Sequence, residues 1–159
     1  MGRLFGTDGI RGVAGEAPLD RDDIYRIGYC LAGYLRATHE RPRLLIGRDT
    51  RISGPWIEGL LRHAIEDAGG TAELCGVLST PAVSLLTQKA SAQAGIMISA
   101  SHNPYQDNGI KVFCAQGTKF TDAVEEDLED RILACGLSAP ERFSPHPDSA
   151  AYHLMISSA

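Results

Sequence analysis

The sequence predicts an α/β fold, a three-layer α/β/α sandwich with a mixed, mostly parallel sheet. Short apolar segments typical of buried strands alternate along the chain with amphipathic segments typical of helices. Helices that separate strands in this order usually cross from one parallel strand to the next and cover the faces of the sheet. Gly, Pro, Ser and Thr residues stand between the segments, where turns and helix starts are expected.

Four helices are expected, because apolar residues recur at helical spacing in four segments. The first opens at Asp20, whose carboxylate suits the N-cap position. The last carries six carboxylates within residues 121–130. We interpret them as a solvated helix N-terminus, favoured by the helix dipole, rather than as a metal site. The expected helices cover residues 20–35, 53–68, 79–89 and 121–134.

Four short apolar segments predict strands. The last of them follows its predecessor after about ten loop residues, which is too short for a helical crossover, so this strand is expected to run antiparallel. Residues 3–15 form a Gly-rich N-terminal segment with few apolar side chains, and no strand is predicted there. The expected strands cover residues 43–47, 71–77, 94–99 and 109–114.

One domain is expected over residues 1–137, followed over residues 138–159 by a linker and the truncated start of a second domain. Three of the eight prolines lie after residue 137, and no strong periodicity returns until the last residues. The apolar stretch 152–156 is a candidate for self-association, so a homodimer is kept as an alternative assembly.

Composition and charge argue against several classes of function. The formal net charge of −5 is unfavourable for sequence-independent nucleic-acid binding, which needs an excess of Lys and Arg. No apolar stretch approaches the roughly 20 residues that span a bilayer, so no membrane partner is expected. The four cysteines and five histidines show no metal-ligand spacing. We therefore expect buried, reduced thiols in a cytoplasmic protein.

Polar segments follow three of the expected strands, at the edge of the sheet where open α/β folds bind ligands. The most informative contains Ser101, which comes directly after the strand at 94–99 and precedes a turn at Asn103-Pro104. A hydroxyl so close to the end of a buried strand is held in a fixed position, which suits a nucleophile. The alternative is an ordinary turn or helix-capping serine.

Positive charge is expected around the same edge. A tight turn at Asn108-Gly109 would bring Lys111 beside the Ser101 loop. Glycines within residues 6–12 would allow close approach of the backbone to an anion. Phosphoryl transfer needs such positioning and positive charge on the transferring oxygens. The basic residues in loops or at strand ends are Arg11, Arg48, Arg51 and Lys111.

Four segments resemble motifs of the α-D-phosphohexomutase family and occur in the same order. The resemblance covers residues 3 to about 135. The opening GRLFGTDGIRG is most similar to the branch that acts on glucosamine phosphates, and the branch that acts on glucose and mannose phosphates is the alternative. The matching segments are FGTDGIRG (5–12), GRDTRISG (47–54), STPA (79–82) and SASHNPYQDNGIKVF (99–113).

The resemblance implies a fold of the phosphoglucomutase first-domain type and an isomerase that interconverts glucosamine 6-phosphate and glucosamine 1-phosphate. Ser101 matches the serine that carries the phosphoryl group through a bisphosphorylated intermediate, and that phosphoserine is also a ligand of the family's Mg²⁺. Arg11, His102 and Lys111 match catalytic residues around it, and Lys111 is expected to exchange a proton with the sugar hydroxyl. The residues expected to bind substrate or phosphate are Thr7, Arg48 and Asn103.

The sequence departs from the family in its extent. The family enzyme has four domains, and the matching segments belong to the first. The Asp-rich loop that supplies the remaining Mg²⁺ ligands has no counterpart in these residues, and neither do the sugar-recognition loop and the phosphate-binding loop of the later domains. The chain by itself is therefore expected to lack mutase activity and to need the missing domains as partners. Rival interpretations are a phosphatase that passes through a phosphoserine and a non-catalytic dimerising module.

Overall fold

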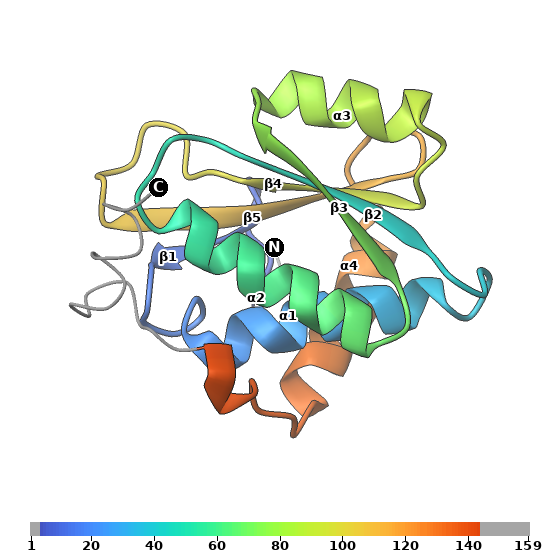
Figure 1. Ribbon diagram of the computed structural model, residues 1–159, viewed down its shortest axis with the longest axis horizontal. Helices are drawn as coiled ribbons and strands as arrows, with labels where there is room; N and C mark the ends of the chain where they lie inside the picture. The colour runs from blue at the N-terminus through green and yellow to red at the C-terminus, as the bar shows by residue number, and fades with distance from the viewer. Residues whose placement is uncertain (1–3, 144–159) are drawn as a thin grey trace.

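A computed structural model describes residues 4–143 of the chain (Figure 1). One five-stranded sheet has helix α3 (Thr80–Lys89) on one face. Helices α1 (Arg21–Leu35), α2 (Gly54–Asp67) and α4 (Asp122–Ala134) cover the other face (Figure 1). The structure therefore confirms the three-layer α/β/α sandwich.

The strands lie in the order β1-β5-β4-β2-β3. Strand β2 (Arg43–Arg48) pairs in parallel with β3 (Thr71–Val77) and with β4 (Ala94–Ile98). Strand β5 (Asp107–Cys114) pairs antiparallel with β4, as the short connection between them predicts, and antiparallel with β1 (Ile10–Val13). The sheet is mixed, and β5 is the strand that runs against the others.

The two helical crossovers have the same hand. The chain steps outward from β2 through α2 to the edge strand β3, and then back through α3 to β4 on the other side of β2. Because the two steps run in opposite directions and α2 and α3 lie on opposite faces of the sheet, the hand is conserved (Figure 1). The carboxyl ends of β2, β3 and β4 consequently meet at one edge of the sheet.

Strand β1 is the main difference between the sequence prediction and the structure. It lies within the Gly-rich segment 3–15, where the sequence predicts no strand. Its pattern is weak because Arg11 and Gly12 separate its two apolar residues, and only Ile10 is fully buried. The strand forms because β5 supplies a hydrogen-bonding edge from a distant part of the chain. The same pairing explains why β5 begins at Asp107, two residues before the predicted strand.

The predicted helix starts agree with the caps in the structure. The Asp20 carboxylate accepts a hydrogen bond from the backbone N–H of Asp23 at 2.8 Å. Ser79 and Thr121 cap α3 and α4 through their hydroxyls in the same way. The start of α2 is different, because the buried Ser53 hydroxyl accepts from the side-chain amide of Asn108 at 2.8 Å instead of capping the helix. Ser53 therefore ties the start of α2 to β5.

The main core lies between the sheet and the three-helix layer. Helix α1 packs against both α2 and α4, and α2 packs on β2, β3 and β4. Within residues 4–143, none of the helices has the length and apolarity needed to cross a bilayer. The largest fully buried side chains include Ile10, Ile24, Leu31, Leu44, Ile46, Leu61, Ile65 and Ile96.

The chain continues in contact with the domain beyond the predicted boundary at residue 137. The backbone N–H of Ala139 donates to Asp22 at the start of α1, and Ala139 is buried. A 3₁₀ turn (Glu141–Phe143) follows, in which Arg142 contacts His63 on α2. The boundary itself stays a prediction, and the apolar stretch 152–156 lies outside the described residues.

The four cysteines are free thiols, and all are partly rather than fully buried. Burial raises the pKa of Cys30 to about 12, and the neighbouring Cys135 thiol adds to the effect. Partial burial also acts on Cys114, but hydrogen bonds with Thr118 and nearby backbone groups outweigh it and lower its pKa. The two thiols therefore differ strongly in thiolate content at neutral pH.

This difference predicts the order of alkylation. The thiolate is the reactive form, so iodoacetamide at mildly alkaline pH should label Cys114 first and Cys30 last. Labelling of Cys114 should already rise with pH below its ordinary pKa. Peptide mass mapping over time gives the order. Cys114→Ser should remove the fastest label, whereas early labelling of Cys30 would contradict the assignment.

Candidate active site

Ser101 lies just beyond the carboxyl end of β4, in the loop that connects β4 to β5. Its backbone adopts the left-handed conformation with φ of 54°, which is uncommon for a residue other than glycine. The turn is held from both sides: the N–H of Ser101 donates to the hydroxyl of Ser99 at 3.1 Å, and the N–H of Asn103 donates to the carbonyl of Ala100 at 3.0 Å. Such a conformation persists only where its surroundings impose it.

Two cations converge on the Ser101 hydroxyl. Arg11 of β1 donates through Nη2 at 3.2 Å, and Lys111 of β5 donates through Nζ at 3.3 Å. The strand register brings them together, because Arg11 lies opposite Gly109 and Lys111 is two residues further along the same face of β5. Gly109 must lack a side chain here, since a Cβ would lie 2.5 Å from the Ser99 carbonyl oxygen.

Asn103 orients Arg11. Its Oδ1 accepts from Arg11 Nη1 at 3.3 Å, and its Nδ2 donates to Asp107 Oδ2 at 3.2 Å. Asp8 adds a longer ion pair with Arg11 at 4.0 Å and is largely exposed. The structure therefore brings the predicted residues Ser101, Lys111, Arg11 and Asn103 into one cluster.

The other predicted site residues are His102, Arg48 and Thr7. His102 follows Ser101 in the loop and is exposed. Arg48 forms an ion pair with Glu58 of α2 at 3.4 Å. Burial raises the pKa of Glu58, although Arg48 acts in the opposite direction. Thr7 lines a small cavity of about 90 Å³ together with Lys111.

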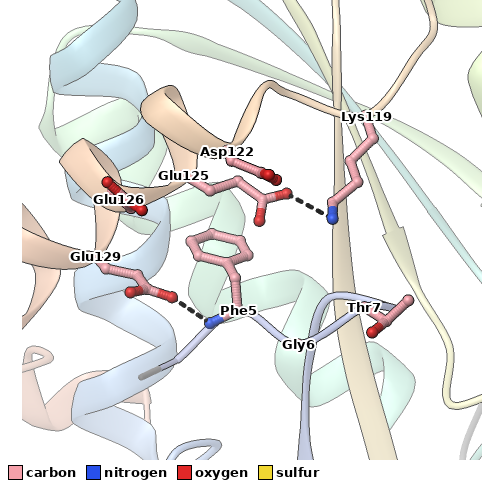
Figure 2. A pocket seen from close by; sticks show the side chains of 8 residues that line it. All are labelled: Phe5, Gly6, Thr7, Lys119, Asp122, Glu125, Glu126 and Glu129. Carbon is pink, nitrogen blue, oxygen red and sulfur yellow. Dashed lines mark hydrogen bonds and ion pairs between the residues drawn. The ribbon is translucent and has the colours of Figure 1, made fainter. Parts of the chain in front are cut away.

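A larger cavity of about 250 Å³ lies between the Thr7 loop and α4 (Figure 2). Lys119 forms an ion pair with Glu125 at 3.3 Å. Glu129 Oε1 accepts from the backbone N–H of Phe5 at 2.6 Å (Figure 2). It also accepts from the backbone N–H of Leu4 at 3.1 Å. Glu125 and Glu129 are buried, so the interpretation of the α4 carboxylates as uniformly solvated was wrong for these two residues. Carboxylates line this cavity and would repel a phosphate, so the cationic cluster at Ser101 is the better phosphate site.

Sequence reasoning missed residues that support the loop. Arg51 was noted only for its charge at a strand end, yet its guanidinium binds backbone carbonyls of the Ser101 loop. Ser99 and Asn108 are buried polar residues next to the same loop. The signal that could have identified them is their position beside Ser101 and Gly109, but their partners become visible only in three dimensions.

Comparisons with known proteins show to which family the chain is similar. Residues 2–136 match the family model described as phosphoglucomutase/phosphomannomutase, alpha/beta/alpha domain I. The chain is 49% identical over 133 residues to a phosphoglucosamine mutase of Syntrophobacter fumaroxidans, a match that covers 84% of this chain and 30% of the relative. It is 48% identical over 147 residues to a phosphoglucosamine mutase of Geobacillus thermodenitrificans, covering 92% of this chain and 32% of that protein.

A solved structure is also similar in fold to this chain. The crystal structure of a phosphoglucomutase/phosphomannomutase family protein from Burkholderia thailandensis matches with a TM-score of 0.72 and 26% identity, covering 86% of this chain and 31% of that one. The chain thus spans about a third of the length of these proteins. In each case the similarity covers nearly all of the described residues.

Proposed function

The chain belongs to the phosphoglucomutase/phosphomannomutase family, as its first, α/β/α domain, and we propose that it carries the phosphoserine of a phosphoglucosamine mutase. The observation that carries the proposal is the hydroxyl of Ser101, which accepts hydrogen bonds from two cations of different strands, Arg11 and Lys111. A serine that only forms a turn is uncharged and is not stabilised by two adjacent cations. A phosphoserine at this position carries a charge of about −1.5 to −2, which the two cations would offset.

In the proposed reaction, phosphorylated Ser101 gives its phosphoryl group to an oxygen of glucosamine 6-phosphate or glucosamine 1-phosphate. The bond between Ser101 Oγ and phosphorus breaks, and a bond between phosphorus and the sugar oxygen forms. The sugar hydroxyl loses a proton and Ser101 Oγ gains one. We assign the proton relay to Lys111, which lies 3.3 Å from Oγ, and the stabilisation of negative charge to Arg11, held by Asn103. The bisphosphorylated sugar then returns its other phosphoryl group to Ser101.

We keep His102 as a catalytic residue that helps with positioning and charge stabilisation around the phosphoserine, and Thr7 and Arg48 as residues that bind the sugar phosphate. Thr7 is supported by the cavity that it shares with Lys111. Arg48 pairs with Glu58 through Nε, so the N–H groups of its two Nη atoms are the donors proposed to bind a phosphate. Cytoplasmic location and a phosphosugar substrate stay predictions of the same proposal.

The family's Mg²⁺ has only part of its site in this chain. No group of three or more His, Cys, Asp or Glu residues that could hold a metal occurs within residues 4–143. The phosphate on Ser101 would supply one oxygen ligand, and a hard cation needs about six. Bound there, Mg²⁺ would offset negative charge on the phosphate. We propose that its other ligands, and the rest of the sugar site, come from the parts of a full-length mutase that this chain does not span. The net mutase reaction therefore needs those parts, whereas a single phosphoryl transfer to Ser101 uses the groups around that serine.

The test is phosphorylation of the chain by glucose 1,6-bisphosphate in the presence of Mg²⁺. A mass gain of about 80 Da on Ser101, detected by mass spectrometry, is the expected result. Ser101→Ala should abolish it. Ser91→Ala is a matched control, because Ser91 is an exposed serine with the same φ of 54° at the far end of the sheet.

Other outcomes would replace the proposal. Phosphate on a residue other than Ser101 would contradict the assignment of the carrier. Steady release of inorganic phosphate would identify a phosphatase. A chain that takes up no phosphate and forms a stable dimer by light scattering would favour a non-catalytic module.

A further inference from the structure

Arg51 lies in the loop after β2, beneath the turn that presents Ser101. Its Nη2 donates to the backbone carbonyls of Ser101 at 2.9 Å and Asn103 at 3.0 Å. Its Nη1 donates to the carbonyls of Pro104 at 2.6 Å and Asp107 at 3.2 Å. One guanidinium therefore binds four carbonyls that span the whole loop between β4 and β5.

The guanidinium is itself held in place. Asp49 Oδ2 accepts from Arg51 Nε at 3.2 Å, and Asp49 Oδ1 accepts from the backbone N–H of Arg51 at 3.1 Å. The Arg51 side chain is only 11% exposed. An arginine has five side-chain N–H donors, and these five bonds, four to carbonyls and one to Asp49, use them all. Arg51 has no donor left for a phosphate and acts on the loop alone.

We propose that Arg51 is the positioning residue of the phosphoryl carrier, an inference that rests on the proposed function of Ser101. Four carbonyl oxygens that point at one place repel each other unless a cation lies between them. Ser101 also holds a left-handed conformation, which is strained for a residue that has a Cβ. Arg51 offsets both effects, and so directs the Ser101 hydroxyl to the point between Arg11 and Lys111.

The planar arrangement of donors on the Arg51 guanidinium, and not its positive charge alone, is needed to hold the loop. A lysine at this position would keep the charge but has three donors on one nitrogen. Its single nitrogen cannot bind all four carbonyls, which the two separate Nη nitrogens of Arg51 share between them. Arg51→Lys and Arg51→Gln should therefore have similar effects on the loop. Arg62 is a matched control, because it is an arginine of α2 whose side chain is 51% exposed and forms an ion pair with Glu66 on the same helix.

Hydrogen exchange tests the loop directly. The amides of Asn103 and Asp107 donate to loop carbonyls, and both Arg51 variants should raise their exchange rates at least about tenfold. Amides of the β2–β4 pairing should exchange as in the unsubstituted chain, which also shows that each variant is folded. Arg62→Lys and Arg62→Gln should change neither set.

Phosphorylation separates positioning from a purely structural role. Both Arg51 variants should take up phosphate from glucose 1,6-bisphosphate about 100-fold more slowly, as a displacement of about 1 Å can produce. In Arg51→Ala, guanidinium ion at low millimolar concentration should restore part of the rate, whereas methylammonium should not.

Two results would overturn the proposal. The first is an Arg51→Lys chain whose loop amides and phosphorylation rate match those of the unsubstituted chain. The second is faster loop exchange with an unchanged phosphorylation rate, which would leave Arg51 only a structural role. If the unsubstituted chain takes up no phosphate, the proposed function of Ser101 fails, and the exchange comparison still decides whether Arg51 holds the loop.

Discussion

Replacing Lys111 with methionine is expected to slow the phosphorylation of Ser101 about a thousandfold while leaving the fold intact. Lys111 Nζ lies 3.3 Å from Ser101 Oγ, so the substitution removes both a charge and a proton donor from the atom where the phosphoryl group is attached. Methionine has a similar length and packs adaptably, so the part of the side chain along β5 keeps its contacts.

The measurement is the rate of mass gain on Ser101 with glucose 1,6-bisphosphate, beside thermal unfolding of the same samples. Lys89→Met is the matched control, because Lys89 is an exposed lysine in the last turn of α3. Its rate should equal that of the unsubstituted chain. An Lys111→Met chain that is phosphorylated at the normal rate would show that Lys111 has no part in the transfer, whatever its distance from Ser101.

Replacing Gly9 with alanine is expected to destabilise the domain by about 3 kcal/mol or more. Gly9 has φ of +88°, a left-handed conformation that is strained for alanine. An added Cβ would also lie inside the contact distance of the Ile110 carbonyl oxygen and 3.1 Å from Lys111 Cγ. Because Ile110 pairs with Ile10, this carbonyl cannot move without opening the β1–β5 pairing.

Denaturant unfolding of a Gly33→Ala chain is the matched control. Gly33 is exposed within α1, and an added Cβ would meet nothing within 4 Å. Alanine favours the helix over glycine, so this variant should gain about 1 kcal/mol. The two substitutions are chemically identical and should change the free energy of unfolding in opposite directions. A loss below about 1 kcal/mol for Gly9→Ala would mean that the backbone around Gly9 adapts easily to an added Cβ.

The helices and their starts could be predicted from the sequence because their signals are local. The carboxylate of Asp20 caps α1 by accepting from the backbone N–H three residues further along the chain, and the hydroxyl of Ser79 caps α3 in the same way. The position of Ser101 after a buried strand is also a local pattern. The short connection to β5 was enough to predict that this strand runs antiparallel.

Features that depend on distant parts of the chain could not be predicted in this way. Strand β1 has too few apolar residues to be recognised without its partner β5. Glu129 is buried because it accepts backbone N–H groups of Leu4 and Phe5, which lie at the other end of the domain in sequence. The role of Arg51 depends on the convergence of loop carbonyls, which no spacing of residues reveals.

The pairing of β1 with β5 also sets the order in which the domain can be completed during synthesis. Ile10 leaves the ribosome about 100 residues before Ile110, its partner in the sheet. At about 5–20 residues per second, β1 has no strand to pair with for roughly 5–20 s. Arg11 therefore reaches Ser101 only after β5 has been made. Ser101 itself is made only ten residues before Lys111, so the charged centre forms among the last parts of the sheet.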